Sequence, residues 1–209
     1  MKLQVAIDRV SINKAIELVE SFNGLVDIIE IGTSLIKDYG LLNLKEITSK
    51  ATKSLILGDI KTNDEGTYEF NMGYKQGFDI LTVMGNSSLE TIEKCYDVSK
   101  EYNKKMMVDL LECSDEKIKE ISNFDDAIYC IHTSIDKKFK NDIISELEDF
   151  KYKFPKIKYI AIAGGINLDI VKILKNYDID IIVVGSSITG SEDPIKAINN
   201  FKEEQVWVS

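Results

Sequence analysis

The feature that most constrains the fold is a repeated unit, a short β-branched or apolar run followed by a stretch with helical periodicity. The apolar residues Ala15, Leu18, Val19 and Phe22 show the helical spacing i, i+3, i+4, i+7. The predicted strands are Leu3–Asp8, Val26–Ile31, Ser54–Lys61, Asp79–Met84, Lys105–Leu110, Asp126–His132, Tyr159–Ala163 and Asp180–Gly185. The predicted helices cover residues 12–22, 34–50, 65–77, 87–103, 115–122, 140–153, 167–176 and 192–202.

Strands that alternate with helices predict a parallel sheet with right-handed crossover connections. Eight such units in 209 residues favour a closed (β/α)₈ barrel, because an open doubly wound sheet of this length usually has fewer strands. No linker rich in proline, glycine or serine interrupts the pattern. We therefore expect one α/β domain, a TIM barrel over residues 1–209.

Composition narrows the possible partners. The net charge of −9 argues against nucleic acid and against an anionic membrane surface, since both require a basic face. No apolar run approaches the roughly 20 residues needed to span a bilayer, and the opening residues show no signal-peptide pattern. The three cysteines, Cys95, Cys113 and Cys130, lack metal-site spacing and suit reduced thiols. We expect a cytoplasmic protein.

Polar residues end most of the predicted strands, and in a barrel the carboxyl ends of the strands form the mouth where substrates bind. Side-chain alternation directs Val5, Ile7, Ile29 and Ile31 towards the helices, so their polar neighbours should point into the barrel. The expected ring at the mouth consists of Asp8, Glu30, Asp59, Lys61, Asp109 and His132.

Several of these residues also have purely structural interpretations. Asp59 and Lys61 could form a buried ion pair, and Asp64 could cap the helix that follows it. Glu30 is harder to explain this way, because a carboxylate among β-branched residues is costly to bury unless it is paired or bound to a metal. Converging carboxylates repel one another, and a hard divalent cation such as Mg²⁺ relieves that repulsion.

Glycines end the last two predicted strands, where barrels commonly bind phosphate through backbone N–H groups. Arg9 is the only arginine, so an anionic ligand must be held mainly by backbone amides or lysines. The alternative for the glycines is a pair of tight strand-to-helix turns. The candidate phosphate-binding residues are Gly164, Gly165, Gly185 and Ser186.

Four segments together resemble the orotidine 5′-monophosphate decarboxylase suprafamily and, within it, the 3-hexulose-6-phosphate synthases. They are Val26–Thr33, the D-x-K-x-x-D motif of Asp59–Asp64, Ala163–Ile166 and Gly185–Gly190. The resemblance extends over essentially the whole chain, including the opening Leu-Gln-Val-Ala-Ile-Asp. The two acidic segments are specific in combination, whereas the glycine motif occurs in many barrels.

The resemblance implies a role for each matching residue. Glu30 and Asp59 would bind Mg²⁺, while Asp8 and Lys61 would contact the hydroxyls and the enediolate of the substrate. Asp64 would reach the active site of a partner subunit, which makes a homodimer with shared active sites the expected assembly. The remaining expected roles are substrate or metal contact for Asp109, proton transfer for His132, and phosphate binding for Gly164, Gly165, Gly185 and Ser186.

The implied reaction is a magnesium-dependent aldol addition of formaldehyde to D-ribulose 5-phosphate, through a metal-stabilised cis-enediolate, that gives 3-hexulose 6-phosphate. Charge would develop on the C2 oxygen, where a metal and Lys61 could stabilise it. His132 could transfer protons near neutral pH.

The sequence departs from the synthase pattern after His132. Related synthases often continue H-T-G-x-D-x-Q, whereas this chain has Ser134 and Lys138 in place of the glycine and the glutamine. Whether Lys137 or Lys138 takes part stays open. One alternative function is 3-keto-L-gulonate-6-phosphate decarboxylase, although those enzymes typically carry an arginine after the last strand, where this chain has Ser186. The other alternative is a sugar-phosphate-binding protein without turnover.

Overall fold

The computed structural model describes residues 1–132 and 143–205. Lys137 and Lys138, and the start of the helix predicted from residue 140, lie outside the described residues. In the described part of the chain, no helix is both long and apolar enough to cross a membrane.

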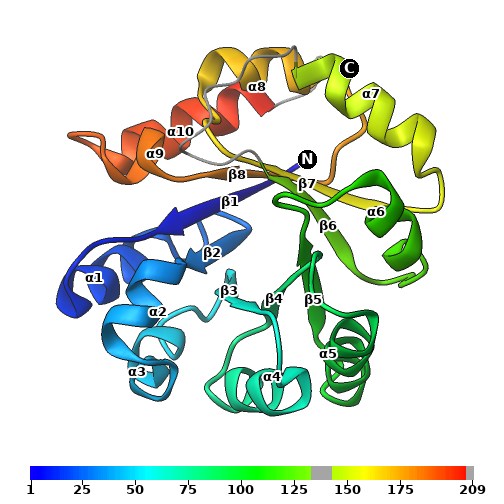
Figure 1. The fold of residues 1–209 in the computed structure, drawn as a ribbon. Helices are drawn as coiled ribbons and strands as arrows, with labels where there is room; N and C mark the ends of the chain where they lie inside the picture. The colour runs from blue at the N-terminus through cyan, green and yellow to red at the C-terminus, as the bar shows by residue number, and fades with distance from the viewer. Residues whose placement is uncertain (133–142, 206–209) are drawn as a thin grey trace.

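The eight strands form a closed parallel barrel in which each strand pairs with the next along the chain and β8 pairs with β1 (Figure 1). This arrangement confirms the predicted (β/α)₈ barrel. The strands are β1 (Lys2–Ile7), β2 (Ile28–Ile31), β3 (Leu55–Thr62), β4 (Ile80–Met84), β5 (Lys105–Asp109), β6 (Ile128–His132), β7 (Tyr159–Ala163) and β8 (Ile181–Val184).

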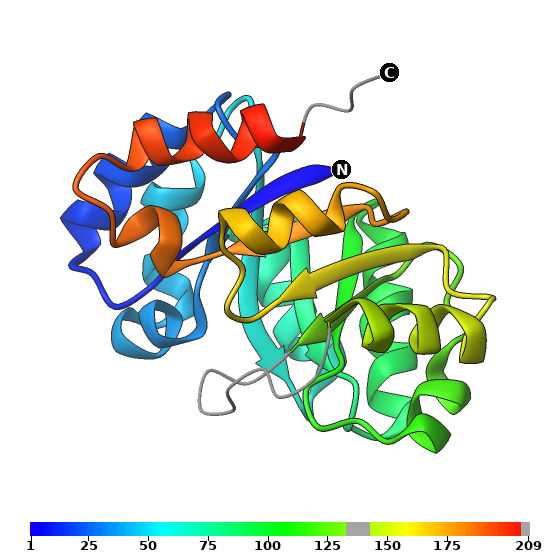
Figure 2. The same cartoon turned by 90° about the horizontal axis from the view of Figure 1, so that it is seen from above.

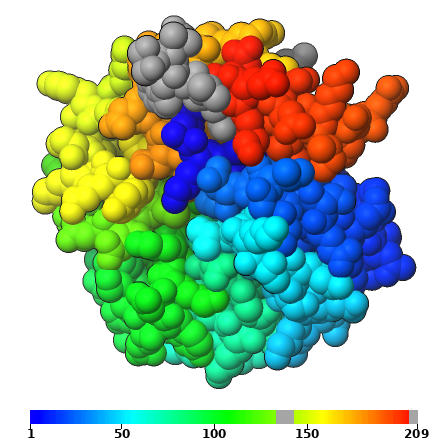
Figure 3. Space-filling view, turned by 180° about the vertical axis from the view of Figure 1, so that it is seen from behind, coloured from blue at the N-terminus to red at the C-terminus, as the bar shows by residue number. Residues whose placement is uncertain are grey.

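The helices surround the barrel, and the colours in Figure 3 follow one another around the molecule in chain order. Side chains of Ser11, Ser88, Ser114 and Asn167 accept hydrogen bonds from backbone N–H groups and so begin four of the helices. The helices α8 and α10 lie side by side (Figure 1, Figure 2). The bounds are α1 (Ile12–Phe22), α4 (Gly66–Lys75), α5 (Leu89–Glu101), α6 (Asp115–Ile121), α7 (Ile143–Lys153), α8 (Leu168–Leu174) and α10 (Pro194–Gln205).

The prediction of one helix over residues 34–50 is wrong. The chain forms α2 (Thr33–Tyr39), the 3₁₀ turn η1 (Leu41–Asn43) and α3 (Lys45–Thr48). Gly40 ends α2 with φ of 75°, a backbone angle that a continuous right-handed helix cannot contain. A further short helix, α9 (Ser186–Thr189), follows β8 directly and was not predicted.

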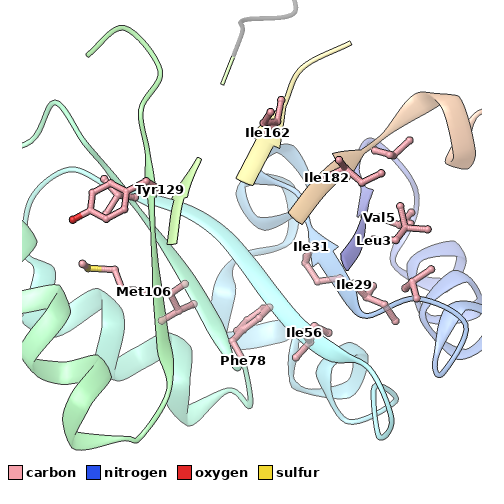
Figure 4. Packing of buried hydrophobic residues seen from close by; sticks show 14 of the residues in the cluster. Leu3, Val5, Ile29, Ile31, Ile56, Phe78, Met106, Tyr129, Ile162 and Ile182 are labelled. Carbon is pink, nitrogen blue, oxygen red and sulfur yellow. The ribbon is translucent and has the colours of Figure 1, made fainter. Parts of the chain in front are cut away.

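Apolar side chains on the two faces of the strands form separate clusters. The outer cluster fills the space between strands and helices, and Figure 4 shows Leu3, Val5, Ile29 and Ile31 within it. This placement confirms the predicted outward orientation of the β1 and β2 side chains. The inner cluster closes the bottom of the barrel and consists of Ile28, Leu57, Ile80, Met107, Ile128, Cys130, Ala161, Ala163 and Ile181. The barrel therefore has a packed floor beneath its polar mouth.

Candidate active site

A cavity of about 520 Å³ opens at the carboxyl ends of the strands. Its wall brings together all but one of the predicted site residues, from both halves of the chain. The predicted residues that line it are Asp8, Glu30, Asp59, Lys61, Asp109, His132, Gly164, Gly165, Gly185 and Ser186. The exception is Asp64.

Two threonines fix the carboxylate of Asp59. The hydroxyl of Thr33, in the first turn of α2, donates to Asp59 Oδ2 at 2.6 Å, and the hydroxyl of Thr82 donates to Oδ1 at 2.8 Å. Because each carboxylate oxygen accepts a hydrogen bond from a neighbouring element, the orientation of Asp59 is set before any ligand arrives.

Glu30 lies deeper in the cavity, with only 8% of its surface exposed. Gln4 Nε2 donates to Glu30 Oε2 at 2.6 Å. Burial, followed by the nearby charge of Asp59, raises the pKa of Glu30 to about 8, although the hydrogen bond from Gln4 acts in the opposite direction. Glu30 and Asp59 thus form an acidic pair whose joint ionisation requires a positive charge.

Asp109 connects the lysine and the histidine. It is 2% exposed, it accepts a hydrogen bond from the Lys61 ammonium, and its Oδ2 lies 2.9 Å from His132 Nδ1. Burial acts to raise the pKa of Asp109, but the hydrogen bond with His132 and the charge of Lys61 lower it to about 2. Burial likewise acts to lower the pKa of Lys61, while Asp59 and Asp109 raise it above its ordinary value.

The backbone at Lys61 has an unusual conformation, with φ of 48°. The β3–β4 pairing shifts register between Gly58 and Thr62, and the Lys61 N–H donates to Thr82 Oγ1 at 2.9 Å instead of continuing the ladder. Thr82 therefore holds both the Asp59 carboxylate and the Lys61 backbone. Ile60 packs against the outer cluster, as the alternation predicts.

Asp8 is positioned by the start of α2. Its Oδ1 accepts a hydrogen bond from the backbone N–H of Leu35 at 3.1 Å. Its carboxyl group lies against Gly32, where an added Cβ would come within 2.6 Å of Asp8 Cγ. Only glycine leaves room for Asp8 at this position, which explains why the glycine follows Glu30 so closely in the sequence.

The opposite wall of the cavity is formed by the ends of β7 and β8. Gly164 and Gly165 have φ of 97° and 64°, conformations that other residues rarely adopt. An added Cβ at Gly185 would meet no atom within 4 Å, so the backbone there faces open space. Ser187 Oγ donates to the Ile166 carbonyl at 2.8 Å and ties the two loops together. These loops let a ligand approach the backbone closely, which suits an anion.

Asp64 is exposed and does not line the cavity of its own chain. Its Oδ1 accepts a hydrogen bond from the Glu65 N–H at 2.8 Å, and no described side chain caps α4. The structure therefore contradicts the interpretation of Asp64 as the cap of α4. The expected contact with a partner subunit stays a prediction.

Seven polar residues of the cavity wall were not among the predicted site residues: Gln4, Arg9, Thr33, Thr82, Asn167, Ser187 and Thr189. Gln4 shares the strand face of Asp8, so alternation could have identified it. Thr82 lies among apolar residues of β4 and resembles any β-branched strand residue, so the local pattern contains little indication of its role.

The donor set fits Mg²⁺. This ion commonly takes one or two protein carboxylates and completes its shell with water and substrate oxygens, and Glu30 and Asp59 provide such a pair. Within residues 1–132 and 143–205, no three or more His, Cys, Asp or Glu side chains form a metal site. A cation here would thus depend on non-protein ligands, and its charge would offset the burial of Glu30 and the repulsion from Asp59 that together raise the pKa of Glu30.

The closed barrel, with acidic, lysine and histidine side chains opposite a glycine-lined wall, defines a barrel enzyme with a site for a small anionic substrate. Residues 1–201 match the model of the orotidine 5′-phosphate decarboxylase / HUMPS family. The chain belongs to this family, which confirms the resemblance inferred from its motifs.

Curated and solved relatives narrow the comparison. The chain is 34% identical over 206 residues to the 3-hexulose-6-phosphate synthase of Bacillus subtilis (strain 168), which covers 97% of this chain and 98% of the relative. A crystal structure of 3-hexulose-6-phosphate synthase superposes with a TM-score of 0.88 at 29% identity, covering 99% of this chain and 100% of the other. These relatives support the predicted enzyme class, a lyase of the 3-hexulose-6-phosphate synthase type.

A third comparison concerns the fold alone. A crystal structure of the KGPDC of Streptococcus mutans has a TM-score of 0.89 at 22% identity, covering 98% of this chain and 96% of the other. Proteins with different names therefore share this fold, and the fold alone does not identify an activity.

Proposed function

We propose that this protein catalyses the magnesium-dependent aldol addition of formaldehyde to D-ribulose 5-phosphate, which forms 3-hexulose 6-phosphate, and the reverse cleavage. The observation that carries the proposal is the meeting of Glu30, Asp59 and the Lys61–Asp109–His132 group in one cavity, facing the glycine-ended β7 and β8. The identity to named synthases over nearly the full chain supports the same reaction.

The substrate orientation follows from the two walls. The backbone N–H groups around Gly165, Gly185 and Ser186 would bind the phosphate, with Gly164 shaping the same loop. The sugar carbons would then extend across the cavity towards the acidic wall, where Asp8 can accept hydrogen bonds from hydroxyl groups.

Glu30 and Asp59 would hold Mg²⁺, which supplies positive charge that stabilises an oxyanion. Thr33 and Thr82 keep the Asp59 carboxylate in place, and Glu30 is nearly buried at the same site. Lys61 stays protonated between its two carboxylate partners and stabilises negative charge on the sugar oxygen.

The chemistry needs one proton removed and one delivered. C1 of ribulose 5-phosphate loses a proton and then forms a bond to the carbon of formaldehyde, as the carbonyl π bond of formaldehyde breaks. The new alkoxide then takes up a proton, so no other reactant is consumed. His132 would move these protons, with Nδ1 held by Asp109 and Nε2 as the nitrogen that exchanges protons.

The test is an assay of formaldehyde consumption with ribulose 5-phosphate, titrated with MgCl₂ after treatment with EDTA. We expect turnover that rises with Mg²⁺ and is abolished by EDTA, and loss of turnover in Asp59→Asn. Absence of turnover at saturating Mg²⁺ would refute the proposal.

The same experiment separates the alternatives. Release of CO₂ from 3-keto-L-gulonate 6-phosphate would identify a decarboxylase. Binding of ribulose 5-phosphate without turnover of either substrate would identify a sugar-phosphate-binding protein.

The proposal includes a homodimer with shared active sites. Asp64 follows β3 near the cavity mouth but is exposed and outside its own cavity, so a second subunit is needed to bring it to a site. We also place the enzyme in the cytoplasm, because its proposed substrate is a phosphorylated metabolite and its described cysteines are free thiols.

A further inference from the structure

Gln4 stands out in the barrel because it is a polar side chain in an apolar layer. It is 1% exposed, and its neighbours on the adjoining strands are Ile28 and Val183. Its flanking residues Leu3 and Val5 point outwards into the helix-facing cluster (Figure 4), so Gln4 points into the barrel. An apolar residue would pack there without desolvating an amide.

The hydrogen bonds of Gln4 are incomplete. Nε2 donates to Glu30 Oε2 at 2.6 Å, whereas the buried Oε1 has no hydrogen-bond partner among the described residues. A buried acceptor without a partner lowers stability. Packing alone therefore does not account for a glutamine at this position, and the contact with Glu30 is its one distinctive interaction.

We infer that Gln4 is a positioning residue for the metal site, which fixes the Glu30 carboxylate in the orientation that binds a divalent cation. The inference rests on the proposed function. The side-chain amide of Gln4 donates to Oε2 of Glu30, so Gln4 does not restrain the other carboxylate oxygen, Oε1 of Glu30. Gln4 orients the Glu30 carboxylate by a hydrogen bond, as Thr33 and Thr82 orient the Asp59 carboxylate. Residues of β1, α2 and β4 thereby set the directions of both carboxylates.

The test measures metal binding directly, with Mn²⁺ as the probe and without sugar phosphate, by electron paramagnetic resonance of free Mn²⁺. In Gln4→Met the donor is removed while side-chain volume is nearly kept. We expect a dissociation constant for Mn²⁺ about 10- to 100-fold higher than in the unmodified protein, with the far-UV spectrum unchanged. Gln4→Asn keeps the amide but shortens its reach, and it should weaken Mn²⁺ binding similarly.

Ser99→Ala is the matched control. Ser99 is a buried polar residue whose hydroxyl contacts Tyr74 and the Cys95 carbonyl away from the cavity. The Ser99→Ala substitution should lower the melting temperature and leave the affinity for Mn²⁺ unchanged. If Gln4→Met or a folded Gln4→Asn binds Mn²⁺ as tightly as the unmodified protein, the positioning role is refuted while the proposed function stands. If the unmodified protein itself does not bind Mn²⁺, the metal site of the proposed function fails as well.

Discussion

Replacing Asp109 with asparagine should destabilise the protein and nearly abolish its activity. The contacts of Asp109 with His132 and Lys61 lower its pKa from 3.8 to about 2. Such a shift corresponds to about 2 kcal/mol of stability at pH 7. For a domain of this size, that loss lowers the melting temperature by roughly 4–8 °C.

The stability that ionised Asp109 contributes depends on pH. Because the folded-state pKa of Asp109 is depressed, its contribution is present above the unfolded-state pKa of 3.8 and is lost as pH falls through about 2. The difference in unfolding free energy between the unmodified protein and Asp109→Asn should therefore shrink between pH 5 and pH 3, as measured by urea denaturation.

Activity provides the second measurement. Without the Asp109 carboxylate, the His132 ring loses the acceptor that orients Nδ1, and kcat should fall by about 10²- to 10⁴-fold. Asp126→Asn is the control, since it removes an exposed carboxylate paired with Lys100 and should change little. Equal melting temperatures for the two variants, or a difference that does not shrink at low pH, would refute the reasoning.

Three further predictions follow from the site. Mixing inactive Asp59→Asn and Asp64→Ala subunits should restore about a quarter of the activity, because half of the dimers are mixed and each has one intact site; no recovery after subunit exchange would contradict shared sites. Gly185→Ala should raise KM for ribulose 5-phosphate about tenfold or more with little change in melting temperature, because its Cβ enters the cavity without a clash; an unchanged KM would place the phosphate elsewhere. In EDTA, the folded state keeps the proton of Glu30 up to a higher pH than the unfolded state does. The resulting contribution to stability is complete below pH 4.5 and should be lost as pH rises through about 8. The urea concentration at the unfolding midpoint should fall over this pH range in the unmodified protein and fall less in Glu30→Gln. Adding Mg²⁺ should reverse the fall.

The sequence predicted the barrel and much of its mouth because both depend on strand alternation. Ile29 and Ile31 flank Glu30, so an outward orientation of the isoleucines required an inward carboxylate. The same rule placed Asp59 and Lys61 in the cavity, although it did not indicate the register shift that gives Lys61 its positive φ.

Features that depend on single backbone conformations or on contacts between distant strands were not predictable. Within residues 34–50, Gly40 was a possible helix end that the apolar pattern outweighed, and its φ of 75° shows where the helix breaks. The hydrogen bond between Gln4 and Glu30 joins residues of neighbouring strands, and propensity carries no information about such a pair. The short helix after Gly185 is too brief to show a period.

The inner face of each strand divides into a floor and a mouth, and this division has an evolutionary consequence. On β3, Leu57 packs in the apolar floor at the bottom of the cavity, while Asp59, two residues further on, lies among the polar side chains of the mouth. Substitutions at the mouth can alter the reaction without disturbing the residues that hold the barrel closed. Residues that contact a ligand and residues that hold the barrel closed can therefore vary separately, and a crystal structure with the same fold at 22% sequence identity shows how far a sequence can change while the barrel is kept.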